Sequence, residues 1–389
     1  MTTMAPTAPA VTGGVDTHAD VHVAAACDHL GAVLGTESFP TTVRGYRALL
    51  AWLRSFGDLV QVGVEGTGSY GTGLARHLAA QGVEVTEVHR PNRQVRRRDA
   101  IAAARAVING DATGKPKSHD GAVEALRALK MVHRSAHKSR TQALNPIRDL
   151  VCTAPDALRG ELRTLRRREL LETCAAFRPG ERDDLVSITK LALRGLAWRV
   201  TELDDEIALL NTRRRRITTT IAPALCAAHG IGPDTASGLL LAAGDNPDRL
   251  RDERSWSALL ASNPIEASSG KVIRHRLNRG GDRQGNAALW RIVIVRMASD
   301  QRTKDYVERR TKEGLSKNEI IRCLKRYLAR ETFALLPRET LILTDRSLRS
   351  IATAHVGAGT CGRSSRQLSD TVVMGYLSRR GPALPLGGW

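Results

Sequence analysis

The first third of the chain alternates between strand-like and helix-like patterns of apolar positions. Residues 14–39 are expected to form a β-hairpin in which Val15, Val21 and Val23 are β-branched strand positions. The elements predicted after it are an amphipathic helix over 41–57, a strand over 60–65 entering a glycine-rich turn, a helix over 72–82, a strand over 83–91 and a helix over 99–110. A leading hairpin followed by alternating strands and helices predicts an α/β fold with a mixed sheet.

Helical patterns replace the strand patterns at about residue 120. Residues 121–151 predict a basic helix, or two helices broken near Pro146. Further apolar residues recur at the 3–4 spacing of a coiled-coil seam: Val186, Leu193, Leu196, Val200, Leu203, Ile207 and Leu210. A helix packed on its own domain would show the same pattern. The length of the pattern and the arginine run at 213–216 favour a helix that protrudes or pairs.

The rest of the chain is expected to be helical and basic. Residues 221–310 predict a third, helical unit, and residues 316–336 predict a basic helix before a tail rich in Ser, Thr, Gly and Arg. The predicted division is a disordered leader (1–11), an α/β domain (12–158), a coiled-coil helical region (159–220), a helical C-terminal domain (221–310) and a basic helix with its tail (311–389). The fold class is therefore α/β plus α.

Charge narrows the range of partners. The 389 residues include 59 Lys and Arg against 40 Asp and Glu, a formal charge of +19. Such an excess favours a polyanionic partner, either nucleic acid or an anionic membrane surface. No stretch reaches the ~18 apolar residues of a membrane span, and the N-terminus lacks the basic start and apolar core of a signal peptide. The six scattered cysteines contain no Cys-x-x-Cys pair. We therefore expect a cytoplasmic protein that binds nucleic acid and no membrane.

Two acids interrupt apolar strands. Asp16 follows Val15 in the first predicted strand, and Glu65 ends the strand at 60–65. Burying a carboxylate is costly unless it is paired or binds a metal. Two adjacent strands would bring both acids to one sheet edge, where a third acid from a helix start, such as Asp99, would complete an oxygen cage suited to Mg²⁺. The alternative is that these acids are ordinary caps or loop residues.

Two stretches of the C-terminal half suggest contact with nucleic acid. Residues 229–245 place Gly230 and Gly232 in a tight turn before a helix that starts at Pro233, the pattern of a helix–hairpin–helix motif. Backbone N–H groups at such a helix start attract phosphate. An ordinary helix connection has the same pattern.

A basic stretch follows the serines at 268–269 and Gly270. Its cationic or potentially cationic residues are Lys271, Arg274, His275, Arg276, Arg279 and Arg283. A serine beside clustered arginines could attack a phosphodiester, because the cations would stabilise the developing charge. The alternatives are a solvated charged face and a routine Ser-Ser-Gly turn.

Three N-terminal stretches together resemble a known family. GVDTHADVHVAA, VGVEGTGSYG and DAIAAARAV occur in the order found in DEDD-type insertion-sequence transposases of the IS-one-ten family, which are related to pilin-gene invertases. The C-terminal basic stretch resembles the same family, so the likeness covers roughly residues 12–330. The resemblance implies a ribonuclease-H-like domain similar to Holliday-junction resolvases, with four acidic Mg²⁺ ligands. Asp16 would be the first ligand, Glu65 the second and Asp99 the fourth.

The resemblance also implies a serine nucleophile that links covalently to DNA, which by position is Ser269. The family mechanism implies recombination of donor and target DNA guided by a non-coding bridge RNA. Its composite site joins the acidic domain of one subunit to the serine domain of another, which implies a dimer or tetramer. A bacterial, nucleoid-associated enzyme is the corresponding expectation for localisation.

The chain departs from the family pattern at three places. Arg96 stands where the third acid is expected, three residues before Asp99, and the segment is shortened there. Ala19 replaces a common lysine of the first motif, and Ala261 stands where a glycine is frequent. An arginine in a metal cage would repel the cation.

Three other functions therefore remain open beside an active transposase. The first is a catalytically impaired nucleic-acid-binding remnant, which the loss of the third acid would favour. The second is a resolvase-like nuclease, in which the serines at 268–269 would have no role. The third is an actin-like sugar kinase or ATPase, which the helical and basic second half disfavours.

Overall fold

The computed structural model describes residues 9–88, 100–271 and 275–337, apart from the side chain of Pro247. The chain divides into two compact units, Met1–Leu343 and Thr344–Trp389. The second unit, and with it most of the predicted tail, lies outside the described residues.

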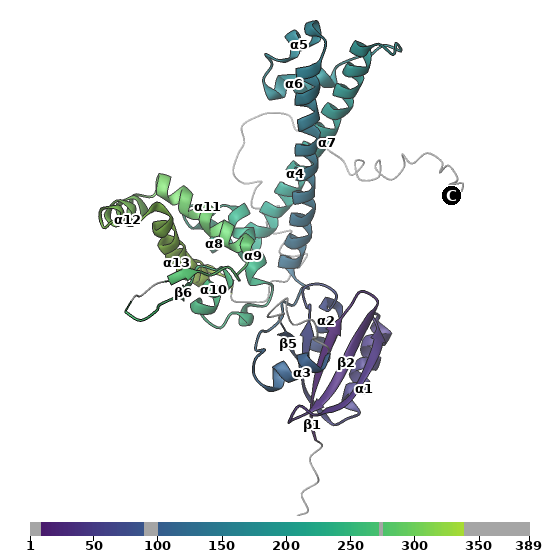
Figure 1. Cartoon of the computed structure of the whole chain (residues 1–389), viewed down its shortest axis with the longest axis vertical. Helices are drawn as coiled ribbons and strands as arrows, with labels where there is room; N and C mark the ends of the chain where they lie inside the picture. Colours follow the sequence, from purple (N-terminus) through teal and green to yellow (C-terminus); the bar gives the residue numbers. More distant parts are fainter. Residues whose placement is uncertain (1–8, 89–99, 272–274, 338–389) are drawn as a thin grey trace, which may run out of the picture. The chain divides into compact units, whose positions relative to one another are not determined.

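A five-stranded mixed sheet forms the N-terminal part (Figure 1). Its strands are β1 (Ala10–Thr17), β2 (Val21–Asp28), β3 (Val33–Pro40), β4 (Asp58–Glu65) and β5 (Glu84–Val88), in the order β3-β2-β1-β4-β5. The first three strands pair antiparallel, and β1, β4 and β5 pair parallel. The predicted hairpin and the mixed sheet are confirmed. The leader predicted at 1–11 is two residues too long, because Ala10 and Val11 belong to β1 and Val11 is fully buried.

Helices cover both faces of this sheet. α1 (Val43–Arg54) and α2 (Thr72–Ala80) bury leucines of their apolar stripes against one face, together with valines of β1 and β4. α3 (Ala100–Ile108) covers the other face. Two adjacent residues of β1 show the separation, since a Cβ on Gly13 would meet Leu53 of α1 and a Cβ on Gly14 would meet α3. This α/β arrangement, followed by helices, is consistent with a ribonuclease-H-like domain.

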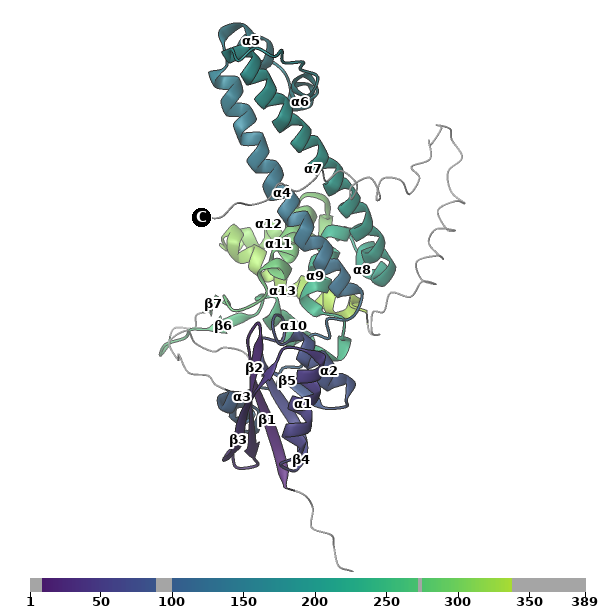
Figure 2. The same cartoon turned by 90° about the vertical axis from the view of Figure 1, so that its right-hand side faces the viewer.

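Two long helices follow as an antiparallel pair (Figure 2). α4 (Ala122–Thr153) runs without interruption through Pro146, so the single basic helix is confirmed and the alternative of two helices broken there is wrong. Proline removes one backbone hydrogen bond from a helix, but Ala143 and Ile147 beside it are buried in the core shared with α7 (Leu185–Ile221). This packing keeps the helix continuous. The short helices α5 (Asp156–Leu162) and α6 (Arg167–Ala175) lie at one end of the pair.

The predicted seam of α7 is largely used within the chain. Leu193 and Val200 are fully buried in one apolar cluster with Ala143 and Ile147 of α4. Val186, the first seam position, is exposed. The helix therefore packs on its own chain, and pairing with another chain stays a prediction.

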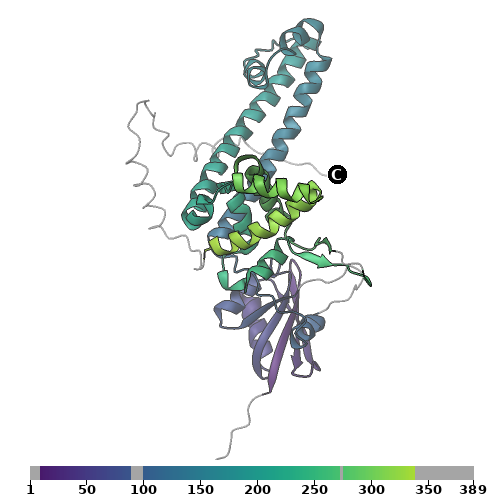
Figure 3. The same ribbon diagram turned by 90° about the vertical axis from the view of Figure 1, so that its left-hand side faces the viewer.

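Helices build a separate core in the C-terminal part. They are α8 (Pro223–Ala227), α9 (Pro233–Ala243), α10 (Glu253–Leu259), α11 (Arg283–Ser299), α12 (Gln301–Lys312) and α13 (Lys317–Leu335), with a 3₁₀ turn at Pro247–Arg249. Figure 3 shows α11, α12 and α13 in light green to yellow-green, and each of these helices contacts the other two. At the centre, the fully buried Trp256 donates from Nε1 to Thr332 Oγ1 at 3.1 Å. α13 confirms the basic helix predicted at 316–336.

One part of the C-terminal prediction is wrong. Two strands, β6 (Pro264–Glu266) and β7 (His275–Leu277), interrupt the unit that was expected to be helical throughout. Each strand has three residues, too few to show a period-2 alternation of apolar positions. None of the described helices combines the length and the apolar character needed to cross a membrane.

Candidate functional site

Asp16 and Glu65 lie at the carboxyl ends of neighbouring parallel strands. β1 and β4 are in register through Val15 and Val64, and the two acids follow this pair directly. Residues in register on parallel strands project to the same face of a sheet. Glu65 is 7% exposed, and Asp16 Oδ2 lies 3.3 Å from Nε2 of His18. The structure thus places the first two predicted acids together on one face.

Helix α3 packs on the same face as these acids. Gly14 and Gly63 are paired two residues before Asp16 and Glu65, so they share the face of the acids. A Cβ on Gly14 would collide with backbone atoms of Ala100 in α3. Glycine is therefore required for the first turn of α3 to lie over β1.

The remaining predicted acid is Asp99. It directly precedes Ala100, the first residue of α3, and both Asp99 and Arg96 lie outside the described residues. Within residues 9–88, 100–271 and 275–337, no group of three His, Cys, Asp or Glu side chains could hold a metal ion. Two carboxylates on one sheet face supply the oxygen donors that Mg²⁺ prefers. The described acids therefore fit the ion as a partial set that needs further ligands.

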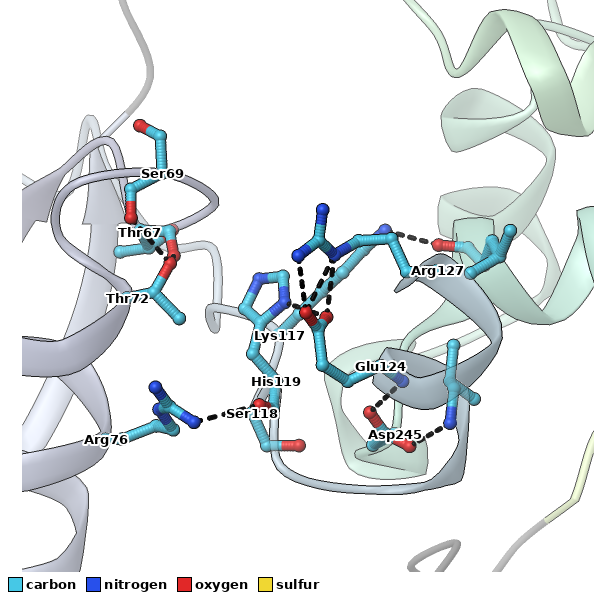
Figure 4. A network of polar contacts seen from close by, with 12 residues as sticks. Thr67, Ser69, Thr72, Arg76, Lys117, Ser118, His119, Glu124, Arg127 and Asp245 are labelled. Carbon is cyan, nitrogen blue, oxygen red and sulfur yellow. Dashed lines mark hydrogen bonds and ion pairs between the residues drawn. The ribbon is translucent and has the colours of Figure 1, made fainter. Parts of the chain in front are cut away.

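Threonine hydroxyls hold the backbone around Glu65. Thr17 donates from Oγ1 to the Glu65 carbonyl oxygen at 2.8 Å. In the turn after β4, Thr67 donates to Glu87 Oε1 at 2.7 Å, and Thr72 donates to the Thr67 carbonyl oxygen at 2.7 Å. Figure 4 shows Thr67 and Thr72 in this turn. The sequence pattern indicated the glycines of the turn but not these threonines, although Thr17 directly follows Asp16 and Thr67 lies two residues after Glu65.

The serine loop belongs to the β6–β7 hairpin. Ser268 and Ser269 follow β6 and are exposed. The hairpin is anchored at its base, where Asn278 Nδ2 donates to Asn263 Oδ1 at 2.8 Å and to the Ala258 carbonyl oxygen at 3.3 Å. A hydroxyl carried on such a hairpin is accessible to a large substrate.

The predicted cations accompany this loop. Lys271, Arg276, Arg279 and Arg283 are exposed, and Arg283 begins α11. Arg274 lies outside the described residues. The surface beside the serines is therefore cationic, as expected, while its contact with phosphate stays a prediction.

Ala261, at the start of the loop before β6, has an unusual backbone conformation. Its φ is +51°, in the left-handed region that glycine adopts without strain. A Cβ on Gly281 would lie 2.7 Å from the Ala261 Cβ, so the chain is also crowded here. The alanine thus stands at a position whose backbone geometry favours glycine.

The turn between α8 and α9 has the expected glycines. Gly230 has φ +77°, and Gly232 is the N-cap of α9, which starts at Pro233. Arg296 of α11 donates from Nε to the His229 carbonyl oxygen at 2.8 Å, which fixes the turn on its neighbour. Its membership of the helix–hairpin–helix class and its contact with DNA stay predictions.

A network of hydrogen bonds, called the polar joint below, holds the segment between α3 and α4 and the start of α4 against the loop after α9. Asp245, 2% exposed, accepts from the backbone N–H groups of Val123 at 2.7 Å and Glu124 at 3.2 Å (Figure 4). Burial raises the pKa of Asp245, and these backbone donors act in the opposite direction. Lys117 Nζ donates to the Leu241 carbonyl oxygen of α9, and burial lowers the pKa of that lysine.

His119 continues this joint toward the sheet. It has φ +55°, its Nδ1 lies 2.9 Å from Glu124 Oε2, and its carbonyl oxygen accepts from Arg76 NH1 of α2 at 3.3 Å. Figure 4 shows these groups between α2 and the start of α4. No local pattern predicts this joint, because its bonds from Arg76 to His119 and from Val123 to Asp245 join residues more than 40 positions apart along the chain.

The acids and the serine come from different parts of the fold. β6 and β7 form a two-stranded sheet of their own, separate from the five-stranded sheet that carries Asp16 and Glu65. The structure therefore pairs two of the predicted acids and presents Ser269 on another element.

Protein-family models match both the part of the chain with the two acids and the part with the serine. Residues 13–154 match a transposase model of the DEDD IS110 type, and residues 222–308 match the model of the transposase IS116/IS110/IS902 family. A search of curated proteins gave no match. The first match contains Asp16 and Glu65, and the second contains Gly230, Gly232 and Ser269. The chain belongs to the IS110 family of transposases.

Proposed function

We propose that this transposase moves its insertion sequence by DNA strand exchange, guided by a non-coding bridge RNA, with a Mg²⁺-binding acidic site and Ser269 as nucleophile. One observation carries the proposal: Asp16 and Glu65 lie at the ends of the adjacent strands β1 and β4, on the sheet face that α3 covers. The exposed serine loop among cations supports the second half of the chemistry.

Each group would have a defined role. Asp16, Glu65 and Asp99 would hold Mg²⁺, which supplies Lewis-acid polarisation of a phosphoryl oxygen when bound. The Ser269 hydroxyl would attack a DNA phosphorus, so that a bond from Oγ to phosphorus forms while a phosphorus–sugar-oxygen bond breaks. The departing sugar oxygen takes up a proton, and the hydroxyl proton of the serine is released. Attack by the sugar hydroxyl of the exchanging strand then restores the serine.

Nearby cations would assist this step. Lys271, Arg276 and Arg279 are exposed on the same loop and hairpin as Ser269. Fixed positive groups stabilise the charge that develops on phosphoryl oxygens in the transition state. Arg274 and Arg283, together with Gly230 and Gly232, would extend the contact along donor and target DNA, where phosphate contacts dominate affinity.

A composite site would join two copies of the chain. The acids and the serine lie on separate sheets, so a serine loop from one copy could meet the acids of another. Helix α7 also leaves apolar side chains exposed, among them Leu185, Ile188, Leu191 and Trp198. These support a homo-oligomer, a dimer or a tetramer.

Two alternatives make different predictions. Arg96 at the position of the third acid favours a catalytically impaired nucleic-acid-binding remnant. A resolvase-like nuclease would use the acids and leave Ser269 without a role.

The first experiment is an in-cell recombination assay scored by sequencing new DNA junctions, with the flanking sequence of the element supplying the RNA. Asp16→Asn should abolish junctions, whereas the exposed Asp20→Asn on the following turn should preserve them. Junctions formed by the Asp16 variant would contradict the acidic site. Junctions that appear only after a Gly-Lys-Ser-Asp-Pro-Ile-like segment is restored before Asp99 would show the impaired remnant.

A second experiment tests the nucleophile. Ser269→Ala should remove covalent protein–DNA adducts while DNA binding persists, and Ser268→Ala should retain adducts. Adducts that persist in the Ser269 variant would place the nucleophile elsewhere, and strand breaks without any adduct in the unaltered protein would indicate the nuclease.

A further inference from the structure

A groove of about 650 Å³ lies between α4, α9 and α11. Its wall on α4 carries three cations and two histidines, and α11 adds Arg291. These residues are Arg127, Lys130, His133, Arg134 and His137. The residue pattern of α4 indicates only a basic helix, and the groove lies on different elements from the serine loop.

The described residues balance only part of the groove's charge: Arg127 is paired with Glu124, its NH2 lying 2.6 Å from Glu124 Oε1. Asp234 is the acid among its lining residues, and it is paired with the buried Arg214 of α7 and, at 2.8 Å, with Arg291. Lys130 and Arg134 make no ion pair with a described residue. The groove therefore keeps a net positive charge.

The positive groups are also crowded. Burial lowers the pKa of Lys130, and the positive charges of Arg214 and Arg291 lower it further, against the opposite effect of Asp234. Holding like charges together in a partly buried place is unfavourable. A bound anion would relieve this repulsion, so the arrangement fits a phosphate-bearing ligand.

The shape of the groove fits a strand of repeating charge. Gly238, Ala287 and Ala288 line it with small residues, and Lys130 Nζ lies 3.6 Å from the position of a Cβ on Gly238. Lys130 and Arg134 are four residues apart on α4, or about 6 Å along a helix that rises 1.5 Å per residue. Two cations spaced along one helix can contact separate phosphates of one strand, because the negative charge repeats along its backbone.

The two histidines add groups that can both donate and accept hydrogen bonds. Nε2 of His133 lies 3.2 Å from Nε2 of His137. Burial, then Arg214 and His137, lower the pKa of His133 against the opposite effects of Asp234 and a hydrogen bond with Asn211, which favours the neutral ring. A neutral imidazole has one donor and one acceptor, and the ribose 2′-hydroxyl is also both donor and acceptor. A contact from this pair to a 2′-hydroxyl would distinguish RNA from DNA.

We propose that this groove binds an RNA strand, with Lys130, Arg134 and Arg291 contacting phosphates and the pair His133–His137 contacting a 2′-hydroxyl. The inference rests on the proposed RNA partnership and assigns it a surface. It is separate from the chemistry at Ser269, so the two can fail independently.

The test measures binding by full-length protein that carries Ser269→Ala. The probes are a short fluorescein-labelled oligouridine and its 2′-deoxy counterpart, followed by anisotropy over a salt series. Lys130→Gln/Arg134→Gln should weaken RNA binding about tenfold and reduce the salt slope by about 1.4, since each phosphate contact with a single strand contributes ~0.7. The matched control Arg148→Gln/Arg199→Gln removes two exposed cations of α4 and α7 outside the groove and should leave the slope unchanged.

The histidines are tested by the ratio of the two affinities. The unaltered groove should prefer the ribose probe, and His133→Ala/His137→Ala should bring the ratio close to one without changing the salt slope. The charge-preserving Lys130→Arg/Arg134→Lys variant should retain the slope, which separates lost charge from lost folding. Equal losses in the groove and control variants, or equal affinity of the unaltered groove for both probes, would overturn the proposal.

Discussion

Replacing Gly14 by alanine tests whether close approach of α3 to the sheet positions the acidic site. Gly14 is on β1, two residues before Asp16, and its missing side chain lets backbone atoms of Ala100 and Ala104 contact the strand. Neither backbone group can rotate away as a side chain can. We expect Gly14→Ala to displace the start of α3, and with it the residue Asp99 that directly precedes the helix.

The magnitude follows from two opposing effects. Overpacking a well-packed interior costs about 1–3 kcal/mol, and backbone partners place this site at the upper end. Alanine in a strand regains about 0.5–1 kcal/mol relative to glycine. The net loss in free energy of unfolding is therefore about 2 kcal/mol. For the adjacent Gly13, whose Cβ would lie 2.9 Å from the movable Leu53 Cδ1, the two effects nearly cancel.

Denaturant unfolding measures the change in free energy of unfolding for Gly14→Ala and for Gly13→Ala. Amide hydrogen exchange over α3 shows whether that helix is the part destabilised. Gly14→Ala should lose protection at residues 100–108, whereas Gly13→Ala should keep it. Equal stability of the two variants, or unchanged protection of α3 in Gly14→Ala, would refute the packing argument. Loss of recombination in Gly14→Ala with α3 protected would place the effect on chemistry rather than on packing.

Three further changes have defined outcomes. Ala261→Gly should raise the midpoint of thermal unfolding, because relief of the +51° φ gains about 1–2 kcal/mol against about 0.5–1 from backbone entropy; a lower midpoint would exclude strain at this residue. His22 is fully buried against Tyr46, and burial, then His18, lowers its pKa below 6.5. The unfolded chain protonates this imidazole more readily than the folded chain, so the free energy of unfolding should fall as pH drops below 6.5. In denaturant titrations, His22→Phe should flatten this pH dependence. An unchanged dependence of stability on pH would implicate other groups. Asp245→Ala should cost about 2 kcal/mol by removing the cap of α4 and should increase proteolysis between residues 113 and 121, whereas normal resistance would show that the joint is dispensable.

Local patterns predicted the elements whose signals are short in range. The amphipathic stripe of α1 places Leu49, Leu50 and Leu53 in the core, as its 3–4 spacing indicates. The capping box of Ser316 and Glu319 starts α13 at the predicted basic helix. The failures have physical causes of longer range. Packing against α7 keeps α4 intact through Pro146, and the strands β6 and β7 exist through their pairing with each other rather than through any pattern of their own.

The candidate site divides in the same way. Residue types and order singled out Asp16 and Glu65 as candidates, because acids inside apolar strands are costly to bury, whereas Ser269 was singled out through the family resemblance. The parallel register of β1 with β4 then placed the two acids side by side, and the glycines beneath α3 determined which face they share with that helix.

By itself, the sequence determined the mixed α/β composition, the basic character and the family of this transposase, since these depend on residue type and spacing. The tertiary structure alone decided that the seam of α7 packs in its own chain, that Asp245 caps α4 from more than 100 residues away, and that cations of α4 face Arg291 across a groove. Such contacts arise from burial and charge shared between distant segments, which no local pattern records.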